Sequence, residues 1–127
     1  MADFNRVLVM GRLTRNPDLR YTATGTAVTD FNLAINRSYT TTEGKARRET
    51  CFVDVTVWRK LAELCGETLK KGSSVFVEGR LHLDTWKGPS GEKRNKLRVI
   101  AESVQFFDRE EGKEDSSEIE TPEKFNF

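Results

Sequence analysis

FVDVTVWR, at residues 52–59, alternates in a way that predicts both a strand and the character of its two faces. Val53, Val55 and Val57 recur at every second position, and side chains two residues apart in a strand point to the same side. The positions between the valines fall on the opposite side: Phe52, Asp54, Thr56 and Trp58. Large rings among polar residues are not what a core requires. The segment therefore predicts an apolar inner face and an outer face that carries rings.

Two further segments continue this division. In SVFVEGRLHLDTW, at 74–86, one side holds Val75, Val77, Gly79, Leu81 and Leu83. The other side holds Phe76, Glu78, Arg80, His82, Asp84 and Trp86. In 93–101 the basic residues Arg94, Lys96 and Arg98 alternate with Leu97, Val99 and Ala101. For Phe76, beside Glu78, we favour a structural role. One side of the predicted sheet is thus aromatic and cationic together.

The rest of the chain up to Phe107 supplies the other elements of a barrel. Strands are predicted at 6–13 and 27–37, with 104–107 as an extension of the fifth. Turns are predicted in NPDLRY and ATGT, and loops in TTTEGKARRE and KGPSGE. LAELCGETLKKG, at 61–72, has helical spacing, with Gly72 placed to end the helix. Five strands with one short helix between the third and fourth predict an all-β fold, a five-stranded OB-fold barrel.

Charge divides the chain into two parts. Residues 1–107 hold 18 Lys and Arg against 12 Asp and Glu, a balance of +6. Residues 108–127 hold 3 against 8, a balance of −5, and contain few apolar residues. We therefore expect one folded domain at 1–107 and a disordered acidic C-terminal tail at 108–127.

Several function classes are disfavoured by composition. No apolar run approaches the roughly 20 residues that cross a bilayer, and the N-terminus lacks a signal-peptide layout, so we expect a soluble, cytoplasmic protein without a membrane role. Cys51, Cys65 and the single His82 cannot build an ordinary zinc site, and we expect both cysteines to be buried apolar residues. With no phosphate-binding loop and no nucleophile–base arrangement, we expect no enzyme, no metal and no cofactor.

An aromatic and cationic sheet surface suits a flexible polyanion with flat bases. Lys and Arg neutralise phosphates and release counterions, while rings stack on bases of any identity. The sequence therefore predicts binding of single-stranded DNA with little sequence preference. RNA is not excluded, because stacking tolerates either sugar.

The residues also resemble a known family. The segment from Asn5 to Gly11, NPDLRYTATGTAVTDFNLAIN, WRKLAELCGETLKKGSSVFVEGRL and TWKGPSG look like bacterial single-stranded DNA-binding protein, over about residues 4–107. The resemblance implies an OB-fold that assembles as a homotetramer, wraps single-stranded DNA and serves replication, recombination and repair. It places the base-stacking rings on Tyr39, Phe52, Trp58 and Trp86. Candidate backbone contacts are Arg6, Arg37, Arg59, Lys60, Lys71 and Arg80, besides Arg94, Lys96 and Arg98.

Two positions depart from the family. Many members carry His after the ring at 52, where it helps subunit pairing, and here Val53 stands there. Family tails end in acidic residues followed by Ile-Pro-Phe, which dock on replication and repair enzymes. This chain ends PEKFNF, so Phe127 and the acids Glu118, Glu120 and Glu123 remain as the candidate partner-binding residues.

Two alternatives come from other functional classes. One is a primosome-type OB protein that acts mainly as a dimeric assembly adaptor. The other is an OB domain whose outer rings bury a protein partner and bind no nucleic acid. Molecular mass in solution distinguishes the dimeric adaptor from a tetramer. Quenching of tryptophan fluorescence by oligo-dT distinguishes a DNA-binding protein from a domain that binds only protein.

Overall fold

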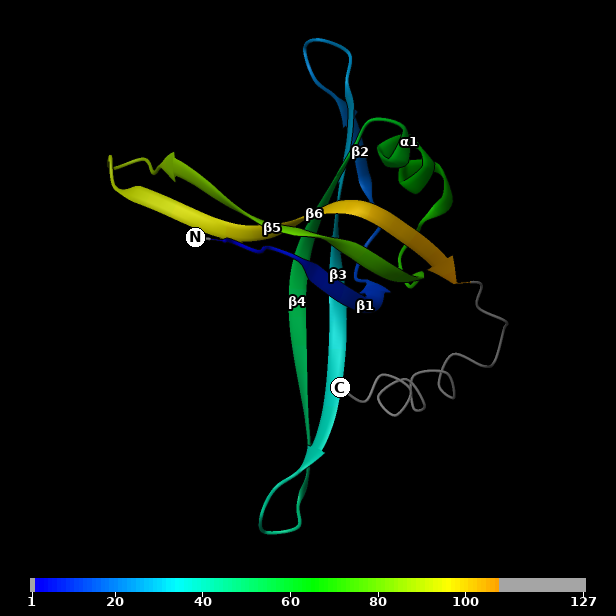
Figure 1. The fold of residues 1–127 in the computed structure, drawn as a ribbon, viewed down its shortest axis with the longest axis vertical. Coiled ribbons are helices and arrows are strands. Elements are labelled where there is room, and N and C mark those ends of the chain that lie inside the picture. Colours follow the sequence, from blue (N-terminus) through cyan, green and yellow to red (C-terminus); the bar gives the residue numbers. More distant parts are fainter. Residues whose placement is uncertain (1, 108–127) are drawn as a thin grey trace.

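The computed structural model describes residues 2–107, which form six strands and one helix. These are β1 (Val7–Leu13), β2 (Asp18–Tyr21), β3 (Ala27–Thr40), β4 (Ala46–Trp58), α1 (Arg59–Thr68), β5 (Ser74–Lys87) and β6 (Lys93–Phe107). The strands follow the order β1-β5-β6-β4-β3-β2, and β1 also pairs with β3 (Figure 1). The β1–β3 pairing and the short parallel pairing of β4 with β6 together close β1, β3, β4, β5 and β6 into a barrel, with α1 between β4 and β5. The predicted five-stranded OB-fold barrel with one short helix is confirmed.

The core is made by the inward side of each alternating strand. Val55 and Val57 of β4 are fully buried, and so are Val75 and Val77 of β5. Phe31 and Leu33 of β3, which pair with Val55 and Val53 of the adjacent β4, belong to the same buried cluster. Helix α1 adds buried residues to this cluster, and the Thr29 hydroxyl donates a 2.7 Å hydrogen bond to the Ala62 carbonyl, which ties α1 to β3. The valine side of the central strands therefore faces inward, as predicted.

A bulge in β6 explains how its last residues extend the barrel. Glu78 pairs with Ser103 but Gly79 pairs with Ala101, so Glu102 is an extra residue on β6. A bulge of this kind changes which side chains face inward beyond it. Before the bulge Val99 and Ala101 face the core, and after it Val104 and Phe106 pack against the core. The expected extension of the fifth strand through Phe107 is correct.

The structure corrects three element boundaries. Asp18–Tyr21, predicted as part of a turn, is strand β2, because it pairs with Ala27–Asp30 and Leu19 packs against the core. Most of TTTEGKARRE is strand, because β3 and β4 stay paired out to Thr40 and Ala46, and the turn is confined to the residues between them. Helix α1 begins at Arg59 and ends at Thr68, while Gly72, with φ +90°, serves the following turn.

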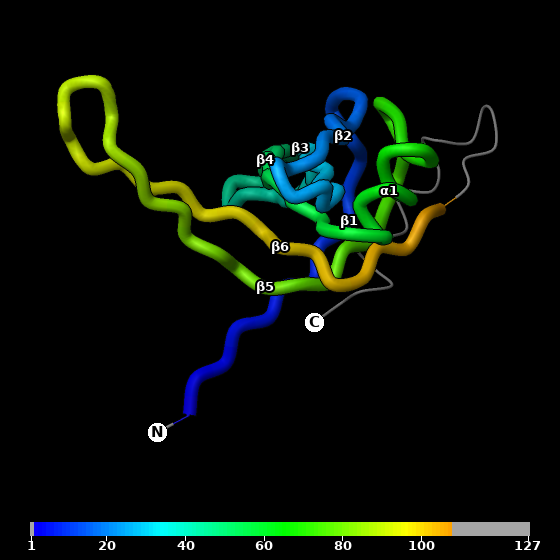
Figure 2. Tube along the Cα trace, turned by 90° about the horizontal axis from the view of Figure 1, so that it is seen from above, coloured from blue at the N-terminus to red at the C-terminus, as the bar shows by residue number. Residues whose placement is uncertain are grey.

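Two hairpins extend beyond the barrel, which changes the environment of their apolar residues. The β3–β4 hairpin and the β5–β6 hairpin project in different directions (Figures 1 and 2). On the second hairpin Leu83 pairs with Leu97, and both are about half exposed, as is Leu81. They occupy the side of the strand that was predicted, but the barrel does not cover them. For the same reason Cys51, on the first hairpin, is exposed, so the expectation that both cysteines are buried is wrong for Cys51.

Cys65 behaves as expected. It is buried in α1, and burial raises the pKa of its thiol to about 12, which keeps it neutral and inert. None of the helices in residues 2–107 combines the length and hydropathy needed to span a membrane. Over the same residues, no group of three His, Cys, Asp or Glu side chains is arranged to hold a metal ion.

Gly79 is predicted to be required for the close approach of β5 and β6. A Cβ at this position would lie 2.1 Å from the carbonyl oxygen of Ile100, and backbone cannot move aside as a flexible side chain can. Gly79→Ala should therefore lower the free energy of unfolding by about 1–3 kcal/mol, measured by urea titration. The exposed Thr85→Ala, farther along the same strand, should change it by less than about 0.5 kcal/mol. Equal effects of the two substitutions would contradict the steric argument.

Candidate nucleic-acid interface

Three of the four predicted rings share one continuous surface on the outside of the barrel. On β4, Phe52 and Trp58 flank Asp54 and Thr56. On the β5–β6 hairpin, cross-strand pairs place Trp86 beside Arg94, Asp84 beside Lys96, and His82 beside Arg98. We call this surface the outer face: Phe52, Asp54, Thr56, Trp58, His82, Asp84, Trp86, Arg94, Lys96 and Arg98. All three rings are substantially exposed, Phe52 to 64 %, Trp58 to 42 % and Trp86 to 46 %.

Polar contacts join the two halves of the outer face. Lys96 of β6 forms an ion pair with Asp54 of β4. Arg98 of β6 donates a 2.7 Å hydrogen bond to the Thr56 hydroxyl and lies between the carboxylates of Asp84 and Asp30. β4 and β6 share only two paired positions, Val55 with Val99 and Thr56 with Ile100. These side-chain contacts therefore reinforce the seam at which the barrel closes.

Asp54 is the carboxylate whose pKa is most clearly changed by these contacts. The ammonium group of Lys96 holds the pKa of Asp54 below its ordinary value of 3.8, and a 2.9 Å hydrogen bond from the Asn32 amide acts in the same direction. Partial burial opposes the change but does not cancel it. Asp54 thus stays ionised and paired with Lys96 under ordinary conditions.

Tyr39 lies in a different place from the other rings. It was expected in a loop but is a strand residue near the end of β3, paired with Arg47 of β4. Phe52 pairs with Ala34, five positions away along β3, so Tyr39 and Phe52 point to opposite sides of the hairpin. The Arg37 guanidinium stacks over the Tyr39 ring at 5.0 Å from its centroid. Tyr39 is 39 % exposed, so its ring remains accessible.

The predicted basic residues divide into paired and unpaired groups. Arg6 contacts Glu78, Arg37 lies 3.7 Å from Glu49, and Arg80 lies 3.3 Å from Glu102. Arg94 pairs with Glu92 at 2.8 Å, and Lys96 and Arg98 are paired as described above. Arg59, Lys60 and Lys71 form no ion pair with any residue of 2–107. The first two begin α1, and Lys71 lies in the turn before β5, where its backbone N–H donates to the Asn16 side chain.

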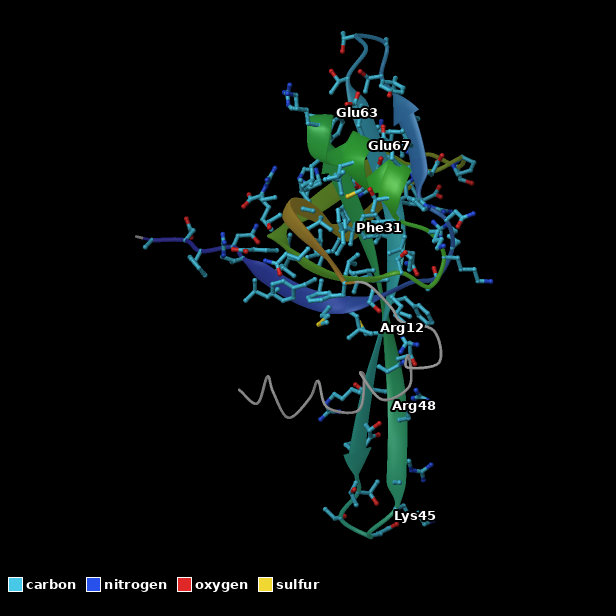
Figure 3. All side chains as sticks on the ribbon, turned by 90° about the vertical axis from the view of Figure 1, so that its right-hand side faces the viewer. Arg12, Phe31, Lys45, Arg48, Glu63 and Glu67 are labelled. Carbon is cyan, nitrogen blue, oxygen red and sulfur yellow. The ribbon has the colours of Figure 1, made fainter. Side chains whose placement is uncertain are left out.

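Sequence reasoning missed the basic residues of the β3–β4 hairpin. Lys45, Arg47 and Arg48 fall in the segment predicted as a connecting loop, yet Arg47 and Arg48 are paired residues of β4 and Lys45 lies in the turn just before it. None of the three has an acidic partner among residues 2–107. We call these three residues the basic arm. Figure 3 shows Lys45 and Arg48 on the hairpin far beyond the barrel, whereas Glu63 and Glu67 of α1 lie at the opposite end. A shallow pocket at the arm is lined by Tyr39, Arg47 and Arg48 among others. The run of basic residues in TTTEGKARRE was the signal that could have identified it.

The candidate partner-binding residues Glu118, Glu120, Glu123 and Phe127 lie outside the described residues.

Asp54→Asn should reduce stability in a pH-dependent manner. A carboxyl group whose folded-state pKa is lowered stabilises the fold above its unfolded pKa, about 3.9, and that stabilisation is lost as the pH falls through the folded value. The variant should therefore unfold more easily than the parent at pH 7, and the difference should shrink as the pH falls below about 4. Urea titrations at pH 7 and pH 3 measure it. A difference of the same size at both pH values would contradict the assignment.

Comparison with known proteins gives a consistent result. The profile described as "Single-strand binding protein family" matches residues 4–107. A protein of Wolinella succinogenes named single-stranded DNA-binding protein is 40 % identical over 126 residues, covering 94 % of this chain and 78 % of that protein. A Bacillus cereus protein of the same name is 45 % identical over 108 residues, covering 85 % of this chain and 62 % of its own length.

Solved structures agree in fold. The single-stranded DNA binding protein from Thermus aquaticus, solved as a deletion mutant, superposes with a TM-score of 0.75 at 37 % identity, over 83 % of this chain and 51 % of that chain. A structure titled "Plasmodium falciparum SSB complex with ssDNA" superposes with a TM-score of 0.78 at 23 % identity, over 85 % of this chain and 98 % of that chain, and supports the fold alone. With the family profile covering nearly all of the barrel, the chain belongs to the single-strand binding protein family.

Proposed function

We infer that this protein binds single-stranded DNA without sequence specificity and without catalysing a reaction on it. The family and the names of the Wolinella and Bacillus relatives support this function. By the same reasoning it acts in the cytoplasm, where it protects and organises single strands during replication, recombination and repair. Residues 1–107 serve as the DNA-binding domain, and 108–127 as an acidic tail.

The observation that carries this inference is the exposure of rings on a surface that also holds cations. Phe52, Trp58 and Trp86 carry large, mainly apolar rings of the kind that cores usually bury, yet each presents its ring to solvent on the outer face. A stacked base contributes about 1–3 kcal/mol by alanine substitution, a value that comes from single-strand binders of this family and not from this structure. Three such contacts give strong binding that does not depend on base identity.

The phosphates are assigned mainly to cations that have no acidic partner among residues 2–107. Lys45, Arg47 and Arg48 of the basic arm, together with Arg59 and Lys60, can neutralise phosphates without first losing a carboxylate partner. Lys71 is unpaired as well but lies off the outer face. The paired cations must exchange a carboxylate for a phosphate, and their net contribution is smaller. Tyr39, on the other side of the β3–β4 hairpin, offers a stacking ring to a strand that passes around the arm.

We also propose assembly into a homotetramer. A single copy leaves Leu8 of β1 and Leu81, Leu83 and Leu97 of the β5–β6 hairpin about half exposed. Contact with further copies of the chain would remove these side chains from water. Val53, in place of the family histidine, is half-buried within β4. The mass in solution separates a tetramer from the dimeric adaptor considered above.

Stacking predicts a fluorescence change that protein docking does not. Oligo-dT should quench the emission of Trp58 and Trp86 strongly, and Trp58→Ala or Trp86→Ala should each weaken binding by about 5- to 150-fold, the equivalent of about 1–3 kcal/mol. A salt titration of the same signal reports the number of phosphate contacts. Leu64→Ala, which removes an exposed apolar side chain from α1, is the matched control and should leave affinity unchanged. Parent protein that shows no quenching by oligo-dT would overturn the proposed function.

The acidic tail is proposed to recruit replication and repair enzymes through Phe127 and the acids before it. Deleting residues 122–127 should abolish binding to such an enzyme while leaving oligo-dT affinity close to that of the parent. Surface plasmon resonance with the enzyme immobilised measures the first, and fluorescence quenching the second. If the shortened protein bound the enzyme as well as the parent did, the tail would be only a solvating segment.

A further inference from the structure

The passage from β4 into α1 contains an unusual backbone conformation. β4 ends at Trp58, which has extended backbone angles of φ −120° and ψ 152°, and α1 begins at the next residue. The chain therefore turns from strand to helix without any linking residue. Arg59 makes this turn with φ +67° and is the one residue other than glycine in 2–107 that has a positive φ.

A positive φ is unfavourable for arginine. A side chain with a Cβ is crowded in this region, and glycine adopts it freely, as Gly25, Gly44, Gly72 and Gly91 do here. Two further features make the same junction unfavourable. Trp58 supplies no capping hydrogen bond, and the first turn holds Arg59 and Lys60 but no acidic residue, at the end of a helix that disfavours cations. Glycine at position 59 would give a more stable fold.

The arginine side chain has no role within the described protein that would offset this strain. It is exposed and forms no ion pair with any residue of 2–107, in contrast to Arg94, Lys96 and Arg98 on the neighbouring strand. What it does have is a position next to an exposed indole. Trp58, one of the three rings of the outer face, directly precedes it.

We propose that Arg59 contacts DNA, and that its strained backbone lowers the stability of the fold while its side chain strengthens DNA binding. Its guanidinium neutralises the phosphate that flanks the nucleotide stacked on Trp58, so that ring and charge act on the same nucleotide. The proposal rests on the proposed function and deepens it, because it assigns stacking and phosphate contact at this point to two successive residues. It also explains why a residue that weakens the fold stands at this junction.

A single variant, Arg59→Gly, tests both effects of Arg59, namely the lower stability of the fold and the stronger DNA binding. Relaxing the backbone should raise the Tm by about 3–8 °C. Removing one phosphate contact should weaken oligo-dT binding about fivefold in moderate salt. It should also reduce the slope of log affinity against log salt concentration by about 0.7, the value for one contact on a single strand. Both are measured on the full chain, by thermal unfolding and by tryptophan quenching across a salt series.

Three companion variants make the result specific. Arg59→Lys keeps both the strain and the charge, so it should retain the Tm and the salt slope of the parent. Arg59→Asn places a residue that tolerates positive φ at the junction but carries no charge, so it should resemble Arg59→Gly in binding. Lys70→Gln removes an unpaired charge from beyond the other end of α1 and should leave the salt slope unchanged.

Two outcomes would overturn the proposal. If Arg59→Gly raised the Tm but kept the affinity and salt slope of the parent, the strain would have no connection with DNA. If Arg59→Gly lowered the Tm, the junction would not be strained. Neither outcome affects the proposed function, which fails only if the parent does not bind oligo-dT. The two failures are therefore distinguishable.

Discussion

Closure of the barrel between β4 and β6 is the constraint on which the rest of the structure depends. These strands run parallel and share only the pairs Val55–Val99 and Thr56–Ile100. Once these pairs form, the sheet has an inner and an outer face. The side chains of each strand then alternate between the two faces. Val55 and Val57 are then buried in the core. Phe52 and Trp58 lie on the opposite side of β4, so their rings are on the outer surface. Barrel closure thus forms the core and places these rings on the outer face together.

The seam also explains the presence of acidic residues on and beside the outer face. Asp30, Asp54 and Asp84 hold Lys96 and Arg98 across β3, β4, β5 and β6, so part of the positive charge serves closure. A surface neutralised in this way attracts a polyanion less than its count of basic residues suggests. We propose that the attraction comes instead from the cations of the basic arm and of the start of α1, which have no acidic partner within the described part of the chain. On this proposal, the charges that hold the barrel and those that bind DNA are largely different residues.

The projecting hairpins place the candidate binding groups where a barrel alone could not. A closed barrel of five strands has a short circumference and a limited outer surface. By staying paired beyond the barrel, β3 with β4 and β5 with β6 carry Tyr39, the basic arm and Trp86 outward on ordered ribbons. The apolar residues on the inner side of these ribbons lose their cover in the same process, which accounts for the exposure of Cys51, Leu83 and Leu97.

Alternation within single strands is a local property, so the sequence by itself determined the strands of the barrel, the helix between β4 and β5, the inward valines and three of the outward rings. It could not determine which cations are free, because pairing such as Lys96 with Asp54 or Arg98 with Asp84 joins residues distant in the chain. The length of the β3–β4 hairpin, the opposite orientation of Tyr39 and the bulge at Glu102 depend on cross-strand register, which only the closed barrel sets. The strained backbone of Arg59 has the same origin, because the docking of α1 on β3 and the end of β4 together leave one residue to make the turn.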